Sequence, residues 1–329
     1  MSKRNKTMLA LLLAAALLCA GCRAQTPEQP MQTDAPAGQA GGFVLPDTIR
    51  VNAEGVPQLR VYVTDAEQVR DMDLEEYLCG VLAGEMKNDW PLEALKAQAI
   101  LARTFVIKFI TEKESLYEGA DISTDIREAQ AYDAAGVNDR VREAVEATRG
   151  LVVCYGQEPI YAWFHAHSGG RTATAAEGLS YKDAAPYTQS VAGGEGGDAP
   201  KDAAEWEARF TAEEVRRAAK EAGVDVGGTV ESVEAGARGE SGRVQRLIVN
   251  GKEVPANEFR VAIGSADMKS TLLTEVAFSD GELLLRGKGY GHGVGMPQWG
   301  AYTMAEDGKD AQSIIHTYFR DVEIVQMWK

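Results

Sequence analysis

The amino-acid sequence predicts an α+β fold, with mixed, mainly antiparallel sheets and helices packed around a substrate cleft. Alternating apolar residues in "DTIRVNAEGVPQLRVYV" (47–63) are typical of two strands. Helical patterns follow over 73–110, and strand patterns interrupted by turn residues return in "SGRVQRLIVNGKEV" (241–254). Strands followed by helices and then by strands favour α+β over a doubly wound parallel sheet.

The composition restricts the class of partner. The chain has 329 residues, of which 45% are hydrophobic, so most of it is expected to fold around a core. Its formal net charge is −15. Because phosphate binding needs a basic surface, this charge argues against nucleic acid as a partner.

The N-terminus predicts export. A basic segment, "MSKRNK", precedes the apolar run "TMLALLLAAALLCAGC", which is too short for a comfortable membrane span. We expect a signal peptide of lipoprotein type over 1–22, with Cys22 lipidated and the protein held at the outer face of the cell membrane. An uncleaved signal anchor and a plainly cleaved signal are the alternatives. A flexible Pro/Gln/Gly-rich linker is predicted over 23–46, and one catalytic domain over 47–329.

Two cysteines, Cys79 and Cys154, lie outside the signal segment. They form either a disulfide or two small buried apolar groups, one in a helix and one in a strand. No C-x-x-C pair is present, so a structural zinc site of the usual kind is not supported.

Several segments have clear local signals. Asp73 followed by Glu76 is typical of a capping box, and Pro91 is typical of a first helical position. Between these signals and the C-terminal strands we expect four further segments: a helix ended by Gly150, a hairpin or two strands over 151–170, a mobile loop over 191–200 and an acidic helical segment over 202–223.

Glu85 is the candidate catalytic acid. It follows an apolar helical run, and the helix C-terminus and apolar neighbours would both raise the pKa of its carboxyl group. A raised pKa lets a carboxyl group hold its proton near neutral pH, as a general acid must. The alternative is an exposed glutamate near a helix end.

The stretch "GKGYGHGVGMPQWGA" (287–301) has glycine at every second position from 287 to 295. In an extended chain this gives one bare face, with His292 on the other face. The spacing does not match a phosphate-binding G-x-G-x-x-G loop. The bare face is either a groove floor that a ligand approaches closely or a surface packed against a helix.

Two other kinds of chemistry have weaker support. His165 and His167 are two residues apart, so on a strand they share a face and could bind a metal, but no H-E-x-x-H motif accompanies them. Ser168 could be a nucleophile, although "HSGGR" is not a G-x-S-x-G elbow.

Four separated segments together resemble the stage II sporulation protein D family of cell-wall enzymes: "EYLCGVLAGEM…WPLEALKAQAILARTF", "AWFHAHSGGRT", "EFRVAIGSADMKSTLL" and "GHGVGMPQWGAYTMA". The resemblance covers about 47–325. It implies a lytic transglycosylase that cuts between N-acetylmuramic acid and N-acetylglucosamine in peptide-free peptidoglycan strands and leaves 1,6-anhydro ends. Its catalytic glutamate falls on Glu85, acting as acid and then as base. Some relatives are non-enzymatic enhancers of a cell-wall amidase, which is the alternative function.

The resemblance also implies further site residues. Lys96 and Arg103 would neutralise lactyl carboxylates of the glycan or orient Glu85. Substrate contact or cleft shape is expected of five more residues: Ser168, Gly169, Arg171, His292 and Gln298. Some members bind zinc after the second helix, but here "ADISTDIREAQAYDAAG" (120–136) has neither cysteine nor histidine. We therefore predict no metal and no cofactor.

Overall fold

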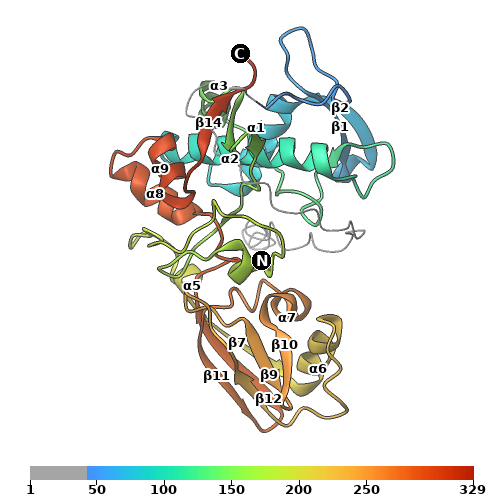
Figure 1. Cartoon of the computed structure of the whole chain (residues 1–329), viewed down its shortest axis with the longest axis vertical. Coiled ribbons are helices and arrows are strands. Elements are labelled where there is room, and N and C mark those ends of the chain that lie inside the picture. Colours follow the sequence, from blue (N-terminus) through green and yellow to red (C-terminus); the bar gives the residue numbers. More distant parts are fainter. Residues whose placement is uncertain (1–42) are drawn as a thin grey trace, which may run out of the picture.

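The computed structural model describes residues 43–329. The predicted signal peptide, Cys22 and most of the 23–46 linker lie outside these residues. Within the described part of the chain, no helix has both the length and the apolar character to cross a membrane. Figure 1 shows a helix-rich upper part and a lower part in which two helices lie beside strands.

The predicted helical pair forms the centre of the upper part. α1 (Leu74–Glu85) begins after Asp73, whose side chain accepts a hydrogen bond from the Glu75 N–H at 2.9 Å. This confirms the predicted cap, whereas the reciprocal bond from Glu76 does not form. α2 (Leu92–Glu112) begins directly after Pro91, and its apolar residues at steps of three and four are buried from Leu95 to Phe109. α3 (Asp139–Ala147) packs against both α1 and α2.

Two small sheets flank these helices. One sheet has the order β2-β1-β3, and the other has the order β14-β4-β5. The predicted hairpin at 151–170 is confirmed by the antiparallel pairing of β4 with β5. Only one of the two strands predicted over 47–63 forms; the rest of that segment contributes an isolated bridge between Val51 and Pro57. The strands are β1 (Gln58–Val63), β2 (Gln68–Asp73), β3 (Ile122–Ser123), β4 (Leu151–Tyr155), β5 (Glu158–Pro159) and β14 (Glu323–Gln326), and a 3-10 turn (Thr64–Ala66) joins β1 to β2.

The middle of the chain connects the two parts. β6 (Phe164–His165) pairs in parallel with β13 (Met296–Pro297), which places the end of the glycine stretch beside the "AWFHAHSGG" segment. This segment continues into short helix α4 (Ala175–Leu179). β13 leads directly into α8 (Gln298–Glu306), and α9 (Ala311–Tyr318) follows.

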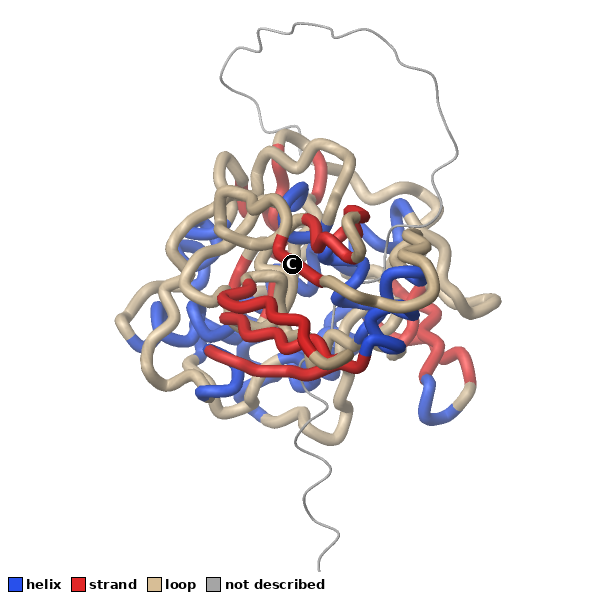
Figure 2. Tube along the Cα trace, turned by 90° about the horizontal axis from the view of Figure 1, so that it is seen from below, coloured by secondary structure: helices blue, strands red, loops and turns tan. Residues whose placement is uncertain are grey.

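The lower part contains two three-stranded antiparallel sheets, ordered β11-β12-β7 and β10-β9-β8. Figure 2 shows strands of this part side by side when the molecule is seen from below. The predicted helical segment 202–223 is partly wrong, because 205–211 form a strand whose alternate residues Trp206 and Phe210 are buried. The elements are α5 (Lys201–Ala204), β7 (Glu205–Thr211), α6 (Ala212–Glu221), β8 (Val233–Ala235), β9 (Arg246–Val249), β10 (Lys252–Pro255), α7 (Ala256–Ile263), β11 (Leu273–Ser279) and β12 (Glu282–Lys288).

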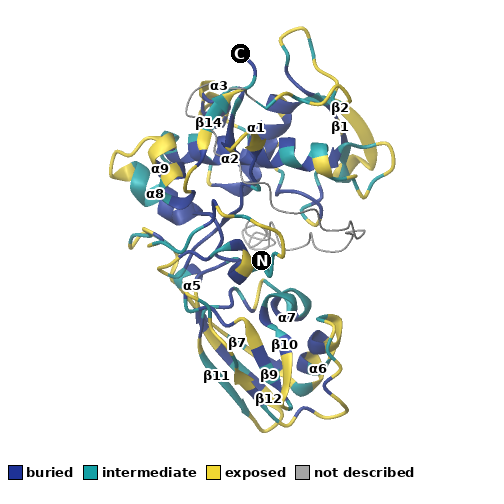
Figure 3. Cartoon of the chain, viewed as in Figure 1, coloured by how far each residue is buried: buried dark blue, intermediate teal, exposed yellow. Residues whose placement is uncertain are grey.

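Each part has its own cluster of buried apolar residues. The larger cluster surrounds α1 and α2, and the smaller one lies between the lower sheets and helices α6 and α7. Figure 3 shows the dark-blue buried residues concentrated on the central helices, whereas the lower strands mix buried and exposed residues along their length. The α+β class with mainly antiparallel sheets is confirmed. Cys79 and Cys154 are buried free thiols in α1 and β4, so the apolar alternative to a disulfide is correct.

Candidate functional site

Glu85 is the last residue of α1 and is only 5% exposed, so the exposed-glutamate alternative is wrong. Its Oε1 accepts a hydrogen bond from the Ala131 N–H at 2.7 Å. Gln298, the first residue of α8, donates through Nε2 to the Glu85 carbonyl oxygen at 3.1 Å and lies 3.5 Å from Oε2. Two segments far apart in sequence therefore meet at this carboxyl group.

The surroundings of Glu85 favour the protonated acid. Burial raises the pKa of Glu85 to about 7, and the hydrogen bonds from Ala131 and Gln298 offset only part of that increase. Neither partner carries a positive charge. A carboxyl group with this pKa can donate a proton near neutral pH and accept one back in the next step.

Loop 120–136 covers Glu85 by packing on a glycine face of α1. A Cβ at Gly80 would lie 2.3 Å from the Tyr132 ring, and one at Gly84 would lie 2.6 Å from the Tyr132 backbone nitrogen. The Asp133 N–H also donates to the Gly80 carbonyl at 2.9 Å. The motifs do not predict this contact, although two glycines four residues apart on a helix are a signal for it.

The covering loop is held by charged and hydroxyl groups. Asp125 pairs with Arg127 at 2.6 Å and accepts a hydrogen bond from the Tyr117 hydroxyl at 2.6 Å. The Arg127 guanidinium is the largest cause of a lowered pKa at Asp125. Glu128 accepts hydrogen bonds from the Ser115 hydroxyl and the Leu116 N–H. Within residues 43–329 no group of three or more His, Cys, Asp or Glu side chains could hold a metal ion.

The glycine stretch is not an extended strand. β12 ends at Lys288, and the glycines at 289, 291, 293 and 295 all have positive φ. A Cβ at Gly291 would lie 2.6 Å from the His165 Cβ, and one at Gly295 would lie 2.0 Å from the Trp163 carbonyl oxygen. The glycines therefore let the chain pack against 163–169, so the packing alternative is correct, with a loop-and-strand segment in place of the expected helix.

His292 is enclosed by this packing. It is 3% exposed, its Nδ1 accepts a hydrogen bond from the Val294 N–H at 3.0 Å, and its ring lies 5.5 Å from that of His165. Burial, followed by the nearby Arg260 and Arg243, lowers the pKa of His292 to about 3. The imidazole is therefore neutral and interior, in contrast to the predicted position at a cleft wall.

The predicted residues of the "HSGGR" segment lie beside the glycine stretch. Ser168 is fully buried; its Oγ accepts a hydrogen bond from the Gly170 N–H, and its carbonyl accepts one from Arg243 at 2.7 Å. Within the described chain no histidine is hydrogen-bonded to that hydroxyl. A Ser168 nucleophile would therefore lack a general base. Gly169 has φ +78°, and a Cβ there would lie 2.9 Å from the Lys288 backbone. Arg171 lies at the surface and donates to the Ser190 hydroxyl.

The two predicted cations of α2 do not meet Glu85. Arg103 is fully buried and pairs with Glu75 at 2.6 Å. Glu75 and Glu85 are ten residues apart on α1, which is about 15 Å along a helix. The expected role of Arg103 in orienting Glu85 is therefore replaced by a structural one. Lys96 pairs with Glu93 at 2.7 Å on the partly exposed face of α2.

The comparisons with known proteins agree with the motifs. A family model described as stage II sporulation protein matches residues 62–155, and one described as a domain of unknown function matches 172–295. The chain is 31% identical to stage II sporulation protein D of Bacillus amyloliquefaciens, over 84% of this chain and 80% of that protein. It is 29% identical to the protein of the same name in Bacillus subtilis, over 84% of this chain and 81% of that protein.

A third relative has a different name. The amidase enhancer of Bacillus subtilis is 26% identical, over 74% of this chain and 39% of that protein. The chain is thus similar to proteins named for sporulation and for amidase enhancement. The chain belongs to the stage II sporulation protein D family.

Proposed function

We propose that this protein is a lytic transglycosylase that cleaves the bond between N-acetylmuramic acid and N-acetylglucosamine in peptide-free peptidoglycan strands. The observation that carries the proposal is the isolated, buried Glu85, whose pKa is raised to about 7. Its hydrogen-bond partners, Ala131 and Gln298, include no second carboxyl group and no cation. The family membership supports a role in the cell wall.

One acid is sufficient for this reaction. Protonated Glu85 gives its proton to the glycosidic oxygen as the C1–O bond breaks, and the glucosamine-bearing part of the strand leaves with a free hydroxyl. The resulting carboxylate then takes the proton from the muramic O6 hydroxyl, whose oxygen attacks C1 and closes a 1,6-anhydro ring. No water is consumed. A hydrolase would need a second carboxylate at a defined distance to activate water or form a covalent intermediate.

The neighbours of Glu85 have supporting roles in this scheme. The Ala131 N–H and Gln298 fix the orientation of the carboxyl group, and loop 120–136 shields it from water. Because Glu85 is 5% exposed, the glycan reaches it when this cover shifts. The other predicted substrate or cleft residues remain predictions: Lys96, Ser168, Gly169, Arg171 and His292. For buried Ser168 and His292, shaping the surrounding fold is the more suitable role.

The place of action follows from the same proposal. Peptidoglycan lies outside the cytoplasmic membrane, and the predicted signal segment with lipidated Cys22 would hold the enzyme at the outer face of that membrane. We also propose that the glycan binds in a cleft near Glu85. The second candidate function is non-enzymatic enhancement of a cell-wall amidase, which the relative named amidase enhancer favours.

Product analysis separates the two functions. Peptide-free glycan strands are digested with the wild type, with Glu85→Gln and with Glu76→Gln, an exposed glutamate on the same helix. We expect anhydro-muramic ends by mass spectrometry from the wild type and from Glu76→Gln, and none from Glu85→Gln. If none of the three cuts glycan while Glu85→Gln still stimulates an amidase, the enhancer function is correct.

A further inference from the structure

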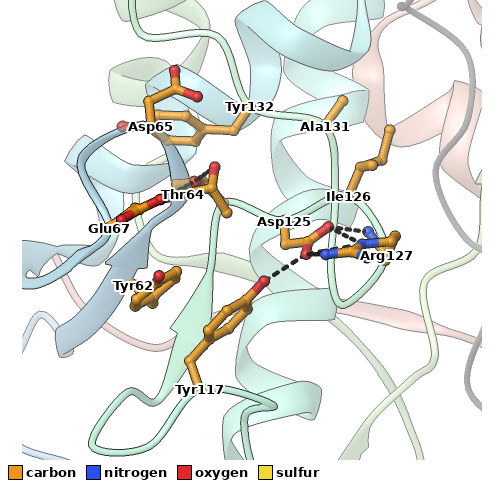
Figure 4. Close-up of a pocket in the computed structure, with 11 residues that line it drawn as sticks. Tyr62, Thr64, Asp65, Glu67, Tyr117, Asp125, Ile126, Arg127, Ala131 and Tyr132 are labelled. Carbon is orange, nitrogen blue, oxygen red and sulfur yellow. Dashed lines mark hydrogen bonds and ion pairs between the residues drawn. The ribbon is translucent and has the colours of Figure 1, made fainter.

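A pocket is lined in part by residues of the loop that covers Glu85. Its volume is about 490 Å³, within the usual range of small-molecule sites. It is bounded by the β1–β2 turn on one side and by 117–132 on the other (Figure 4). Neither segment was assigned a role by the motifs.

Aromatic rings form part of the pocket wall. Tyr62 and Tyr117 stack with ring centroids 3.9 Å apart and an interplanar angle of 7°, and Tyr132 contributes a third ring. The Tyr117 hydroxyl donates to Asp125, which is itself paired with Arg127, so the stack is anchored (Figure 4). Rigid aromatic rings beside polar groups suit a ligand with apolar C–H faces and a polar rim, which describes a pyranose sugar.

The charge of the pocket selects among sugars. Asp65 and Glu67 are exposed at its edge, and within the described chain neither side chain has a hydrogen bond or an ion pair. The negative charge of Asp125 is offset by Arg127. The net charge of the lining is therefore negative, which disfavours the lactyl carboxylate of a muramic residue and any phosphate. A neutral N-acetylglucosamine or its cationic de-N-acetylated form is compatible.

The pocket is adjacent to the proposed acid. Ala131 lines it and, through its backbone N–H, donates to Glu85 Oε1 at 2.7 Å. A sugar held there lies against the same loop that covers the acid. Occupation of the pocket and cleavage at Glu85 can thus involve one glycan strand.

We propose that this pocket is a binding subsite for a glucosamine-type sugar of the glycan strand, one without an acidic substituent. The inference deepens the proposed function and rests on it. The Tyr62–Tyr117 stack packs against the sugar ring, and Asp65 with Glu67 bind hydroxyl, amide or ammonium groups at its edge.

Binding is tested on the full chain by calorimetry with two probes, a neutral N-acetylglucosamine tetramer and a cationic glucosamine tetramer. Tyr117→Ala should weaken both by about tenfold, whereas Tyr117→Phe should retain binding because the ring remains. The double variant Asp65→Asn/Glu67→Gln should weaken the cationic probe by about tenfold at low salt and the neutral one by less than about threefold. Tyr155→Ala, an exposed tyrosine on β4, is the control.

The outcomes distinguish the inference from the function on which it rests. Unchanged binding of both probes by Tyr117→Ala, with the variant folded as judged by thermal unfolding, would overturn the subsite. Preferred binding of a muramic-acid-bearing glycan at this pocket would overturn its proposed selectivity. If the wild type binds both probes but cuts no glycan, the subsite stands and the lytic function fails.

Discussion

Helix α1 carries a buried glutamate near each end, and the two carboxyl groups have different partners. Glu75 and Glu85 are each 5% exposed. Glu75 pairs with Arg103 at 2.6 Å and also accepts hydrogen bonds from Trp328 Nε1 at 2.8 Å and from the Gly150 N–H at 3.1 Å. Glu85 has only neutral donors. The two buried glutamates therefore differ in their partners: a cation lies beside the Glu75 carboxylate, and neutral donors alone bond to Glu85.

The largest expected effect is on catalysis at the Glu85 end. Glu85→Gln keeps the shape and the acceptor for the Ala131 N–H but removes the transferable proton. We expect glycan cleavage to fall by at least about a thousandfold, measured as the rate of anhydro-end formation. Glu76→Gln should retain the wild-type rate. Substantial residual cleavage by Glu85→Gln would assign the acid to another residue.

The next effect is on stability at the Glu75 end. Arg103→Met leaves a buried carboxylate without its cation, so we expect the free energy of unfolding to fall by about 3–5 kcal/mol in urea titrations. Lys96→Met, which removes a partly exposed pair with Glu93, should cost less than about 1 kcal/mol. If Arg103→Met were as stable as Lys96→Met, the structural role given to Glu75 would be wrong.

The pH dependence of stability should reveal the raised pKa of Glu85. The folded-state pKa of Glu85 is raised from 4.5 to about 7, so its contribution to stability is present below pH 4.5 and is lost as the pH rises through 7. A shift of this size corresponds to about 3 kcal/mol. Glu85→Gln should therefore match the wild type at pH 4 and exceed its unfolding free energy at pH 8. Parallel pH curves for the two proteins would contradict the raised pKa.

A smaller effect is expected where loop 120–136 packs on α1. In Gly84→Ala the new methyl group would lie 2.6 Å from the Tyr132 backbone nitrogen, which must move. We expect a loss of about 1–3 kcal/mol in unfolding free energy, together with faster hydrogen exchange in the loop. Gly197→Ala, where no atom lies within 4 Å of the new Cβ, is the matched control. Equal exchange in both variants would show that the loop does not depend on this contact.

Sequence patterns gave the local elements more reliably than the long-range contacts. The α1–α2 pair and the β4–β5 hairpin follow from caps and apolar periodicity. β7 was expected to be helical because its acidic neighbours obscured the alternation of Trp206 and Phe210. In the glycine stretch a period of two suggested a strand, but positive φ angles that only glycine adopts easily produce the same spacing.

For the site, the sequence predicts individual residues but not the contacts between them. Glu85 and Gln298 were both selected from motifs, and their contact was not foreseen because it joins residues 213 positions apart. The partners of Glu75 could not be read from periodicity, since Arg103 and Trp328 come from distant segments. Periodicity reports which face of a helix is buried, and the tertiary fold decides what that face meets.

The most direct test of the difference between the two glutamates is a pH titration of side-chain carboxyl carbons by NMR. Spectra of the wild type, with the Glu85 signal assigned by its absence from Glu85→Gln, should show this carboxyl group titrating near pH 7. Titration of Glu85 at the ordinary glutamate value of 4.5 would contradict the account, because the group would then be ionised at neutral pH and could not serve as the acid.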